Sequence, residues 1–295
     1  MTAVTSFELY MERISRGDRL TPDEILGLAA TPDILSLGML ADALRRRLHG
    51  TRATFLRVAE IPFDSVAASV PAAAQEVRLT GAPASLDAAV ASTEAAKAIS
   101  EGRPLAGFSW VDVARWAEGS PFEQVLGRLK RAGLDAITEL PLDSIDDPAA
   151  AVRRLKDIGF QELRLTIGKA SAETRPSLLL LASELQDASE CIQSINPLPL
   201  TLATFRPTTG YEDVKMVALA RLAAPGIPSI QVDWQRYGPK LAQVALTFGA
   251  DDIDAVSPSD DAPEGKRRAP RAEIERNVQA AGFVPVERDG RFNLL

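Results

Sequence analysis

From residue 51 onward, short apolar runs alternate with longer segments in which apolar residues recur every three or four positions. The short runs have the length of buried strands, and the longer segments have the period of helices that pack on one face. This alternation is typical of βα units on a parallel sheet. The predicted strands are Ala53–Val58, Glu76–Thr80, Leu105–Trp110, Ala136–Leu140, Glu162–Ile167, Ser194–Leu198, Ser229–Trp234 and Asp252–Val256. Eight strands at this spacing favour an α/β fold that closes as a TIM-like (β/α)8 barrel over an open doubly wound sheet.

Helices are predicted between the strands. They cover Ser85–Ile99, Pro121–Ala132, Ala149–Ile158, Glu173–Glu190, Tyr211–Ala223, Gly238–Phe248 and Arg271–Ala281. Three of them end in the same way, at Gly133, Gly159 and Gly282. A glycine after the last helical residue, followed by a strand, is the usual junction between a helix and a strand.

The first fifty residues carry helix signals and no strand signals. Thr21-Pro22-Asp23-Glu24 places a capping threonine before a proline at the first helical position, with acidic residues in the first turn. Thr31-Pro32-Asp33 repeats this arrangement and opens a helix that ends in the basic run Arg45–Arg47 and Gly50. We therefore predict a helical segment over residues 1–50, packed on a barrel formed by residues 51–295.

Composition narrows the classes of partner. The net charge of −7 and the isoelectric point of about 5.0 oppose a general affinity for nucleic acid or for anionic membranes. Apolar runs all fall short of the roughly 18–20 residues that cross a bilayer, so we expect no membrane span. Charged residues interrupt positions 1–20, where a signal peptide needs an apolar stretch, so the expected location is cytoplasmic. Neither a GxGxxG motif nor a P-loop motif occurs, so no nucleotide-binding motif is present.

Metal ligands are scarce in this sequence. Cys191 is its only cysteine and His49 its only histidine. One cysteine forms no internal disulfide, and one cysteine with one histidine supplies too few ligands for a zinc or iron–sulfur site within the chain. We therefore predict no metal and no such cofactor.

Four segments in the last third of the chain resemble a known group of enzymes. They are Arg206–Lys215, Gly238–Leu246, Phe248–Asp254, and Val284–Asp289 with Phe292-Asn293. In this order they resemble aminofutalosine synthase and dehypoxanthine futalosine cyclase, the radical S-adenosylmethionine (SAM) enzymes of the futalosine route to menaquinone. The related deazaflavin synthase subunits share some of these segments, so the branch of origin stays open. The resemblance implies a barrel of the radical SAM type, in which a CxxxCxxC loop after the first strand binds a [4Fe–4S] cluster.

The sequence departs from that family where the cluster is bound. The segment Arg57–Val66 contains no cysteine and no histidine. Gly81-Ala82-Pro83 stands where the family has paired glycines and a histidine, and Lys266–Arg268 replaces a histidine-bearing apolar segment. Cluster-binding thiolates are thus missing. We expect no iron–sulfur cluster, doubt the binding of SAM, and expect no reductive cleavage of it.

Candidate site residues are sought at the carboxyl ends of the strands, where barrel enzymes place their chemistry. These positions offer Ser109, Trp110, Glu139, Thr166, Lys169, Asn196, Arg206, Asp233, Trp234 and Asp254. Arg206 suits a carboxylate or a phosphate. Asp233 and Glu139 suit ribose hydroxyls, or act as bases if burial raises their pKa. Trp110 and Trp234 either stack on a flat ligand or pack in the core, and the acidic groups at strand ends either bind a ligand or pair only with neighbouring cations.

Three hypotheses about function follow. In the first, the chain is a pseudoenzyme that acts as partner or regulatory subunit of a cluster-bearing relative or another menaquinone-pathway protein, which requires an exposed apolar patch. In the second, it is a binding module for a nucleoside or aromatic carboxylate intermediate. In the third, it is an enzyme that uses strand-end carboxylates in non-radical chemistry. The third has the least support, because the predicted barrel contains no histidine to act as a base near neutral pH.

Overall fold

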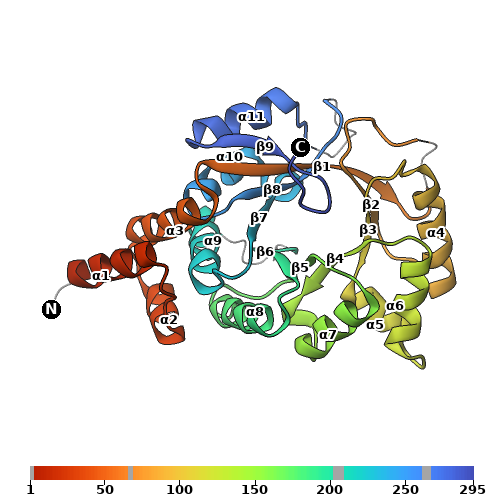
Figure 1. Cartoon of the computed structure of the whole chain (residues 1–295), viewed down its shortest axis with the longest axis horizontal. Coiled ribbons are helices and arrows are strands. Elements are labelled where there is room, and N and C mark those ends of the chain that lie inside the picture. The colour runs from red at the N-terminus through yellow and green to blue at the C-terminus, as the bar shows by residue number, and fades with distance from the viewer. Residues whose placement is uncertain (1–2, 66–68, 202–208, 261–266) are drawn as a thin grey trace.

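The computed structural model describes residues 3–65, 69–201, 209–260 and 267–295. Within these ranges a ring of parallel strands forms a closed barrel with helices around it (Figure 1). The strands are β1 (Arg52–Pro62), β2 (Glu76–Thr80), β3 (Leu105–Ser109), β4 (Ala136–Pro141), β5 (Leu163–Ile167), β6 (Ile192–Pro199), β7 (Ser229–Asp233), β8 (Asp252–Val256) and β9 (Val284–Glu287). Strand β1 pairs with both β2 and β8, which closes the ring. The predicted TIM-like (β/α)8 barrel is therefore confirmed.

Three helices precede the barrel and the others follow its strands. The N-terminal helices are α1 (Ala3–Arg16), α2 (Pro22–Ala30) and α3 (Ile34–His49). The helices after them are α4 (Leu86–Ile99), α5 (Trp110–Trp116), α6 (Phe122–Arg131), α7 (Pro148–Ile158), α8 (Arg175–Ser189), α9 (Gly210–Ala223), α10 (Trp234–Thr247) and α11 (Arg271–Ala280), with a 3-10 turn at Leu142–Ser144. Among the described helices, none is long and apolar enough to cross a bilayer.

Two predicted strands end one residue too late. Trp110 and Trp234 are the first residues of α5 and α10, because Ser109 and Asp233 cap these helices. The Ser109 side chain accepts a hydrogen bond from the Val111 N–H, and this cap belongs to a capping box that ends the strand. Helix α5 was not predicted, because the apolar run of β3 continues into this helix without a break.

Strand β9 is also absent from the eight predicted strands. It pairs in parallel with the first half of β1, from Arg52 opposite Val284 to Phe55 opposite Glu287. Its four residues include a proline and alternate only weakly between buried and exposed positions, so their pattern carries little strand signal. The residues that follow β9 run back to the amino end of the barrel, where the polar contacts described below hold them.

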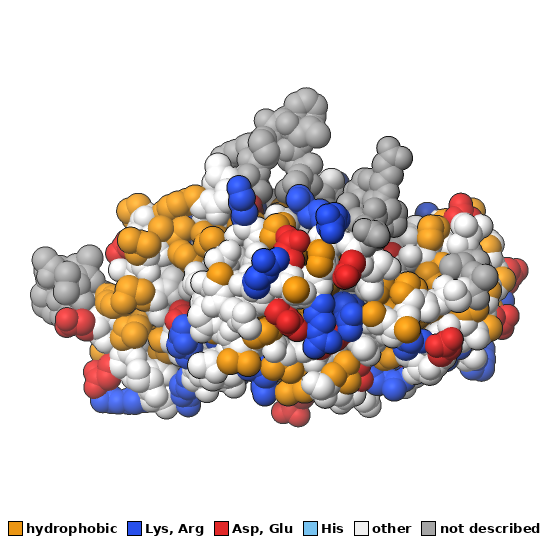
Figure 2. All heavy atoms as spheres, turned by 90° about the horizontal axis from the view of Figure 1, so that it is seen from above, with side chains coloured by type: hydrophobic (Ala, Val, Ile, Leu, Met, Phe, Trp, Pro, Cys, Tyr) orange, Lys and Arg blue, Asp and Glu red, His pale blue; other side chains and the backbone are white. Residues whose placement is uncertain are grey.

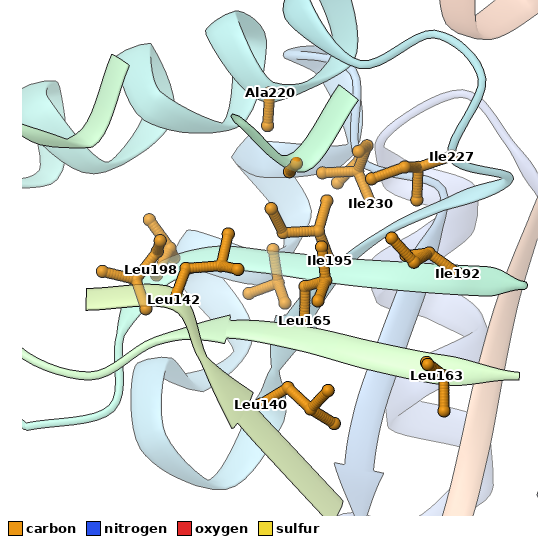
Figure 3. Packing of buried hydrophobic residues seen from close by; sticks show 14 of the residues in the cluster. Leu140, Leu142, Leu163, Leu165, Ile192, Ile195, Leu198, Ala220, Ile227 and Ile230 are labelled. Carbon is orange, nitrogen blue, oxygen red and sulfur yellow. The ribbon is translucent and has the colours of Figure 1, made fainter. Parts of the chain in front are cut away.

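The apolar core lies between the barrel wall and the helices. Leu165 on β5, Ile195 on β6 and Ile230 on β7 are buried and lie on the outer face of the wall, and Ala220 of α9 lies over them (Figure 3). Successive strand residues point to opposite faces, so the residues between these apolar positions point into the barrel.

The N-terminal helices pack against α8, α9 and α10. Arg45 of α3 is fully buried and donates hydrogen bonds to the carbonyls of Ala250, at 3.0 Å, and Gly50, at 3.1 Å. Gly38 of the same helix lies against the ring of Phe248, and a β-carbon at this position would come within 2.6 Å of the ring. Helix α3 begins at Ile34 with Asp33 as its cap, two residues after the predicted cap Thr31. Thr21 caps α2 as predicted, in a capping box with Glu24.

The contact between α3 and Phe248 gives a test with a matched control. Gly38→Ala adds a methyl group where no space exists, so we expect it to lower the free energy of unfolding by about 1 kcal/mol or more. Gly27→Ala, in α2, meets no atom within 4 Å. It should raise the free energy of unfolding by up to about 1 kcal/mol through helix propensity. Urea unfolding of both variants measures the difference, and equal stabilities would contradict this packing of α3.

Candidate functional site

The interior of this barrel is polar. Barrels of this class normally fill their interior with layers of branched apolar side chains. Here the side chains of Arg78 (β2), Arg164 (β5), Gln231 (β7) and Asp254 (β8) all point inward. Arg78 binds Asp254, Arg164 binds Glu76, and Gln231 binds Asp252. A polar interior requires that its charges be paired, and these charges are.

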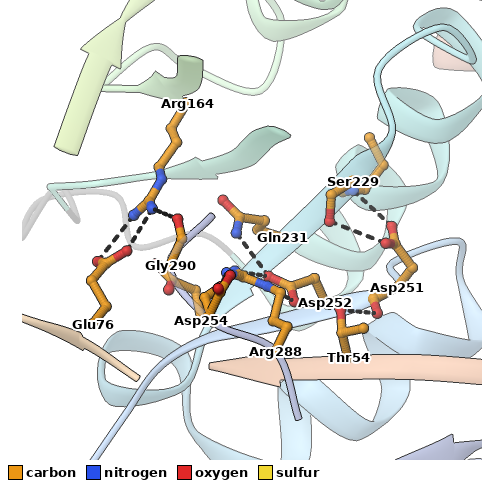
Figure 4. Close-up of polar contacts among 12 residues, drawn as sticks. Thr54, Glu76, Arg164, Ser229, Gln231, Asp251, Asp252, Asp254, Arg288 and Gly290 are labelled. Atoms are coloured by element: carbon orange, nitrogen blue, oxygen red, sulfur yellow. Dashed lines mark hydrogen bonds and ion pairs between the residues drawn. The ribbon is translucent and has the colours of Figure 1, made fainter. Parts of the chain in front are cut away.

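One carboxylate, Glu76, binds two arginines. Its Oε2 accepts a hydrogen bond from Arg164 at 2.5 Å, and its Oε1 accepts one from Arg78 at 2.6 Å (Figure 4 shows Glu76 and Arg164). Arg78 also donates two bonds of 3.0 Å to Asp254. Burial opposes ionisation of Glu76, but Arg164 and Arg78 hold its pKa below the ordinary value. Arg78 likewise lowers the pKa of the buried Asp254, so both carboxylates stay ionised.

A second carboxylate, Asp252, fixes the segment after β9. Arg288 donates to its two oxygens at 2.7 and 2.6 Å, and Gln231 and Thr54 donate at 2.7 and 2.5 Å (Figure 4). The ring of Phe292 lies 4.0 Å from the Arg288 guanidinium. Residues 288–292 therefore close the amino end of the barrel with charged and aromatic contacts.

Two other carboxylates, at the carboxyl end, are less completely paired. Asp233 accepts the backbone N–H of Arg236 at 2.8 Å and lies 3.5 Å from its guanidinium. Glu139 has no hydrogen bond or ion pair with any other described residue, and Arg236 and Arg78 are its nearest cations. Burial raises the pKa of both groups above the ordinary value. Carboxyl groups in this state bind hydroxyl or ammonium groups, and they hold a proton more readily than exposed carboxyl groups do.

Two buried hydroxyl groups lie on the inner face of β5 and β6. Thr166 of β5 and Ser194 of β6 are buried, and neither side-chain oxygen has a hydrogen-bond partner. Both lie on the same face of the wall as Arg164, because Arg164 pairs with Ser194 and Thr166 pairs with Asn196. The amide oxygen of Asn196 accepts the Leu198 N–H at 3.1 Å. A buried hydroxyl without a partner costs about 1–3 kcal/mol, so this part of the wall is suited to a polar ligand.

An apolar cavity of about 200 Å³ opens at the carboxyl ends of β1 and β8. Strand β8 pairs with β1 with a register shift between Phe55 and Arg57 and ends at Val256, whereas β1 continues to Pro62. Ala255 of β8, at φ 57°, lies in this irregular stretch. The cavity is lined by Val58, Glu60, Ile61, Gln235, Ala255 and Pro258, among others. Gln235 follows the end of β7 and Ala255 lies near the end of β8, so the cavity lies at the carboxyl end of the barrel.

The structure places the remaining predicted site residues in other roles. Trp110 stacks on Phe122 with parallel rings 5.1 Å apart, and Trp234 is fully buried, so neither ring presents a free face. Ser109 caps a helix, and Asp254 is occupied by Arg78. The backbone N–H of Lys169 bonds to Asp143. Arg206 lies outside the described residues.

Sequence reasoning missed the arginines inside the barrel. Arg78 and Arg164 stand in mid-strand, and only strand ends were searched. Their signal was nevertheless present: Glu76 and Arg78 in one strand, and Asp252 and Asp254 in another, are polar residues two positions apart within apolar runs. That spacing places them on one face, which a barrel turns inward.

The C-terminal third of the chain matches a known family model. Residues 200–295 match the CofH/MqnC C-terminal region. Over these residues the chain is similar to the CofH/MqnC family. The 5-amino-6-(D-ribitylamino)uracil–L-tyrosine 4-hydroxyphenyl transferase of Archaeoglobus fulgidus is 30% identical, over 64% of this chain and 64% of its own length. Aminodeoxyfutalosine synthase of Thermus thermophilus is 26% identical over 95% and 94% of the two chains. Cyclic dehypoxanthine futalosine synthase of Streptomyces coelicolor is 24% identical over 98% and 88%.

Solved structures share the architecture of this chain. The FeFe-hydrogenase maturase HydG of Carboxydothermus hydrogenoformans superposes with a TM-score of 0.69 at 13% identity, over 97% of this chain and 80% of that one. Methylornithine synthase (PylB) gives 0.63 at 15% identity, over 94% and 97%. At these identities the likeness concerns the fold alone. The fold is therefore the TIM-like barrel of the radical SAM type that the resemblance implies.

Residues that could bind a [4Fe–4S] cluster are few in this chain. Residues 63–75, which follow β1, include no cysteine and no histidine. Cys191 directly precedes β6 and His49 precedes β1, so both lie at the amino end of the barrel, away from the carboxyl end of β1. Three thiolates at one place are needed to hold such a cluster. The donor set of this chain does not fit the group.

The raised pKa of Glu139 predicts a pH-dependent stability difference. The folded chain disfavours the ionised form, so above the ordinary pKa of about 4.3 this charge lowers the free energy of unfolding. Glu139→Gln should therefore be more stable than the wild type at pH 7, and the difference should disappear below about pH 4, where the carboxyl is protonated in both states. Urea unfolding at several pH values measures it. The exposed Glu94→Gln serves as control, and a Glu139→Gln difference that does not change with pH would contradict this environment.

Proposed function

We propose that this chain is a cluster-free, radical SAM-like barrel that binds a small molecule at its carboxyl end. The observations that carry the proposal are an apolar cavity at the carboxyl end of the barrel and incompletely paired polar groups near the same end, namely Glu139, Asp233 and the hydroxyl of Thr166. Pockets of this composition use their apolar part for affinity and a few polar groups for orientation. A nucleoside or an aromatic carboxylate has both parts.

Each part of the site has its own role in this proposal. The cavity between the ends of β1 and β8 holds the flat or apolar part of the ligand. Glu139 and Asp233 accept hydrogen bonds from its hydroxyl or amino groups, and Thr166 adds a hydroxyl that acts as donor or acceptor. Arg206, the residue predicted to bind a carboxylate, stands between β6 and α9 in the sequence. Its role in the proposal rests on the sequence alone.

Absence of the cluster is part of the same proposal. The relatives named above cover nearly all of this chain or about two thirds of it, yet the segment after β1 supplies no thiolate. The cavity lined by residues of β1 and by Ser69 and Pro71 lies in the region where the family carries its cluster loop. A ligand-binding role fits these facts without any radical step.

A partner role is the second candidate, and an exposed apolar surface favours it. On the N-terminal helices, Leu35 is 72% exposed, Met39 58% and Leu26 44%. Hydrophobic side chains gather on this end of the molecule, at the left of Figure 2. Exposed apolar groups in this number are typical of surfaces that bind another chain. The cluster-bearing relative or another menaquinone-pathway protein remains the proposed partner.

Native mass spectrometry of the protein, gently isolated from its own host, tests the two candidates. We expect a co-purifying small molecule that is lost in Arg206→Ala and in Asp233→Asn, since asparagine keeps the helix cap but removes the charge. Asp18→Asn, on the exposed turn after α1, should keep it. A bound second chain without a small molecule would favour the partner role, and a bare chain would contradict both.

Anaerobic reconstitution with iron and sulfide tests the cluster-free part. We expect no stable binding of iron and no absorption of a cluster in the visible range, and Cys191→Ser should behave like the wild type. A [4Fe–4S] cluster would give about four iron atoms per chain. That result would overturn this part of the proposal while leaving the ligand site open to its own test.

A further inference from the structure

A second crevice lies at the amino end of the barrel, opposite the candidate site. Its volume is about 140 Å³, and it lies among the first residues of β3 and β4, the turn before β5 and the segment after β9. Six charged side chains from separate parts of the chain line it: Glu76, Lys130, Asp135, Glu162, Arg164 and Arg291. Glu139 and Asp233 do not line this crevice, so an inference about it stands independently of the proposed function.

Four of these six side chains are paired with one another or with other groups: Glu76, Asp135, Arg164 and Arg291. Asp135 accepts hydrogen bonds from Lys97 at 3.0 Å and from the Leu105 N–H at 2.9 Å, and Arg291 approaches it at 3.3 Å. Arg164 binds Glu76 and donates to the Gly290 carbonyl at 2.8 Å. Of the three guanidinium nitrogens of Arg164, only Nε is buried without an acceptor.

Lys130 and Glu162 are the two charges that remain. In the described part of the chain neither makes a hydrogen bond or an ion pair, although each lies near enough to affect the other's charge. The Lys130 ammonium lies 4.6 Å from the centre of the Phe160 ring. Burial lowers the pKa of Lys130 and raises that of Glu162, which means that the surroundings do not compensate either charge fully.

The two side chains face the crevice without closing on each other. Helix α6 carries Lys130, and the Lys130 ammonium group lies over the face of the Phe160 ring. Glu162 has a φ of 59°, a left-handed conformation that is unfavourable for a residue with a β-carbon. Strained backbone of this kind persists where the surroundings fix it, and such positions cluster at ligand sites. The crevice thus presents a positive and a negative group that are not paired with each other by an ion pair.

We propose that this crevice binds a small zwitterion, such as a free α-amino acid with a short side chain. Its ammonium group binds Glu162, and its carboxylate binds Lys130, with Arg291 as a second donor. An anion alone would leave the Glu162 carboxylate unpaired and repelled, and a cation alone would do the same to Lys130. A molecule that carries both charges compensates both groups at once. The small volume of the crevice restricts the ligand to a few non-hydrogen atoms beyond these charges.

Titration of the full, isotope-labelled chain with glycine tests the proposal, with acetate and methylammonium as single-charge probes. We expect glycine to shift the amide resonances of Gly159, Glu162 and Arg291 in a saturable way. Acetate and methylammonium should bind at least tenfold more weakly. Glu162→Gln and Lys130→Gln should each weaken glycine binding at least tenfold, and the exposed Arg131→Gln, one residue along α6, should leave it unchanged. Asp233→Asn, at the other end of the barrel, should also leave it unchanged.

Other outcomes would overturn the proposal in distinguishable ways. If glycine causes no saturable shift, the crevice is not a zwitterion site. If acetate binds as tightly as glycine and Glu162→Gln has no effect, the crevice is an anion site. If methylammonium binds as tightly and Lys130→Gln has no effect, it is a cation site. Lys130→Arg keeps the charge and should keep most of the affinity, so it separates a lost charge from a disturbed fold, which the amide spectrum reports directly.

Discussion

The carboxylate of Glu76, buried inside the barrel, is the constraint on which the rest of the structure depends. A charge in that position is tolerated only when its partners are in place, and its partners come from β2 itself and from β5, on the other side of the ring. Arg78 extends the contact to Asp254 of β8. These bonds tie three separate strands together through the interior, so the ring closes in one register around a polar centre.

The same network separates structural charges from available ones. Asp254 stands at a strand end, where chemistry is expected, but Arg78 occupies it. Asp233 is opposite Asp254 in the next strand and has only a 3.5 Å contact with Arg236. Arg78 is engaged with Glu76 and Asp254, so it contributes to the field at Glu139 without binding it. The candidate site therefore consists of the carboxylates to which Arg78 and Arg164 do not bind.

Periodicity and caps predicted the fold to within a few residues. Strands β2 and β8 begin and end as expected, because Gln75 and Gly81 bound the first and Asp251 and Ser257 bound the second. Glycines at 133, 159 and 282 adopt positive φ, as their position after helices required. The site was predicted less well. A strand-end position says which end of the barrel a residue occupies, but it does not say what lies across the ring, which decides whether Asp254 is free or whether Trp234 is packed. Strand alternation would have shown the inward direction of Arg78 and Arg164, but not their partners.

The position of β1 has a consequence for synthesis on the ribosome. This strand lies between β8 on one side and β9 and β2 on the other, and Thr54 pairs with Asp252, about 200 residues later in the chain. At typical elongation rates that interval takes about 10–40 s. During this time Phe55 and Leu56, which precede the part of β1 that pairs with β2, lack their neighbouring strands and have unprotected edges. The nascent chain therefore stays incomplete, and open to wrong pairing, until its last strands emerge, which makes shielding by a chaperone more important here than rapid local folding.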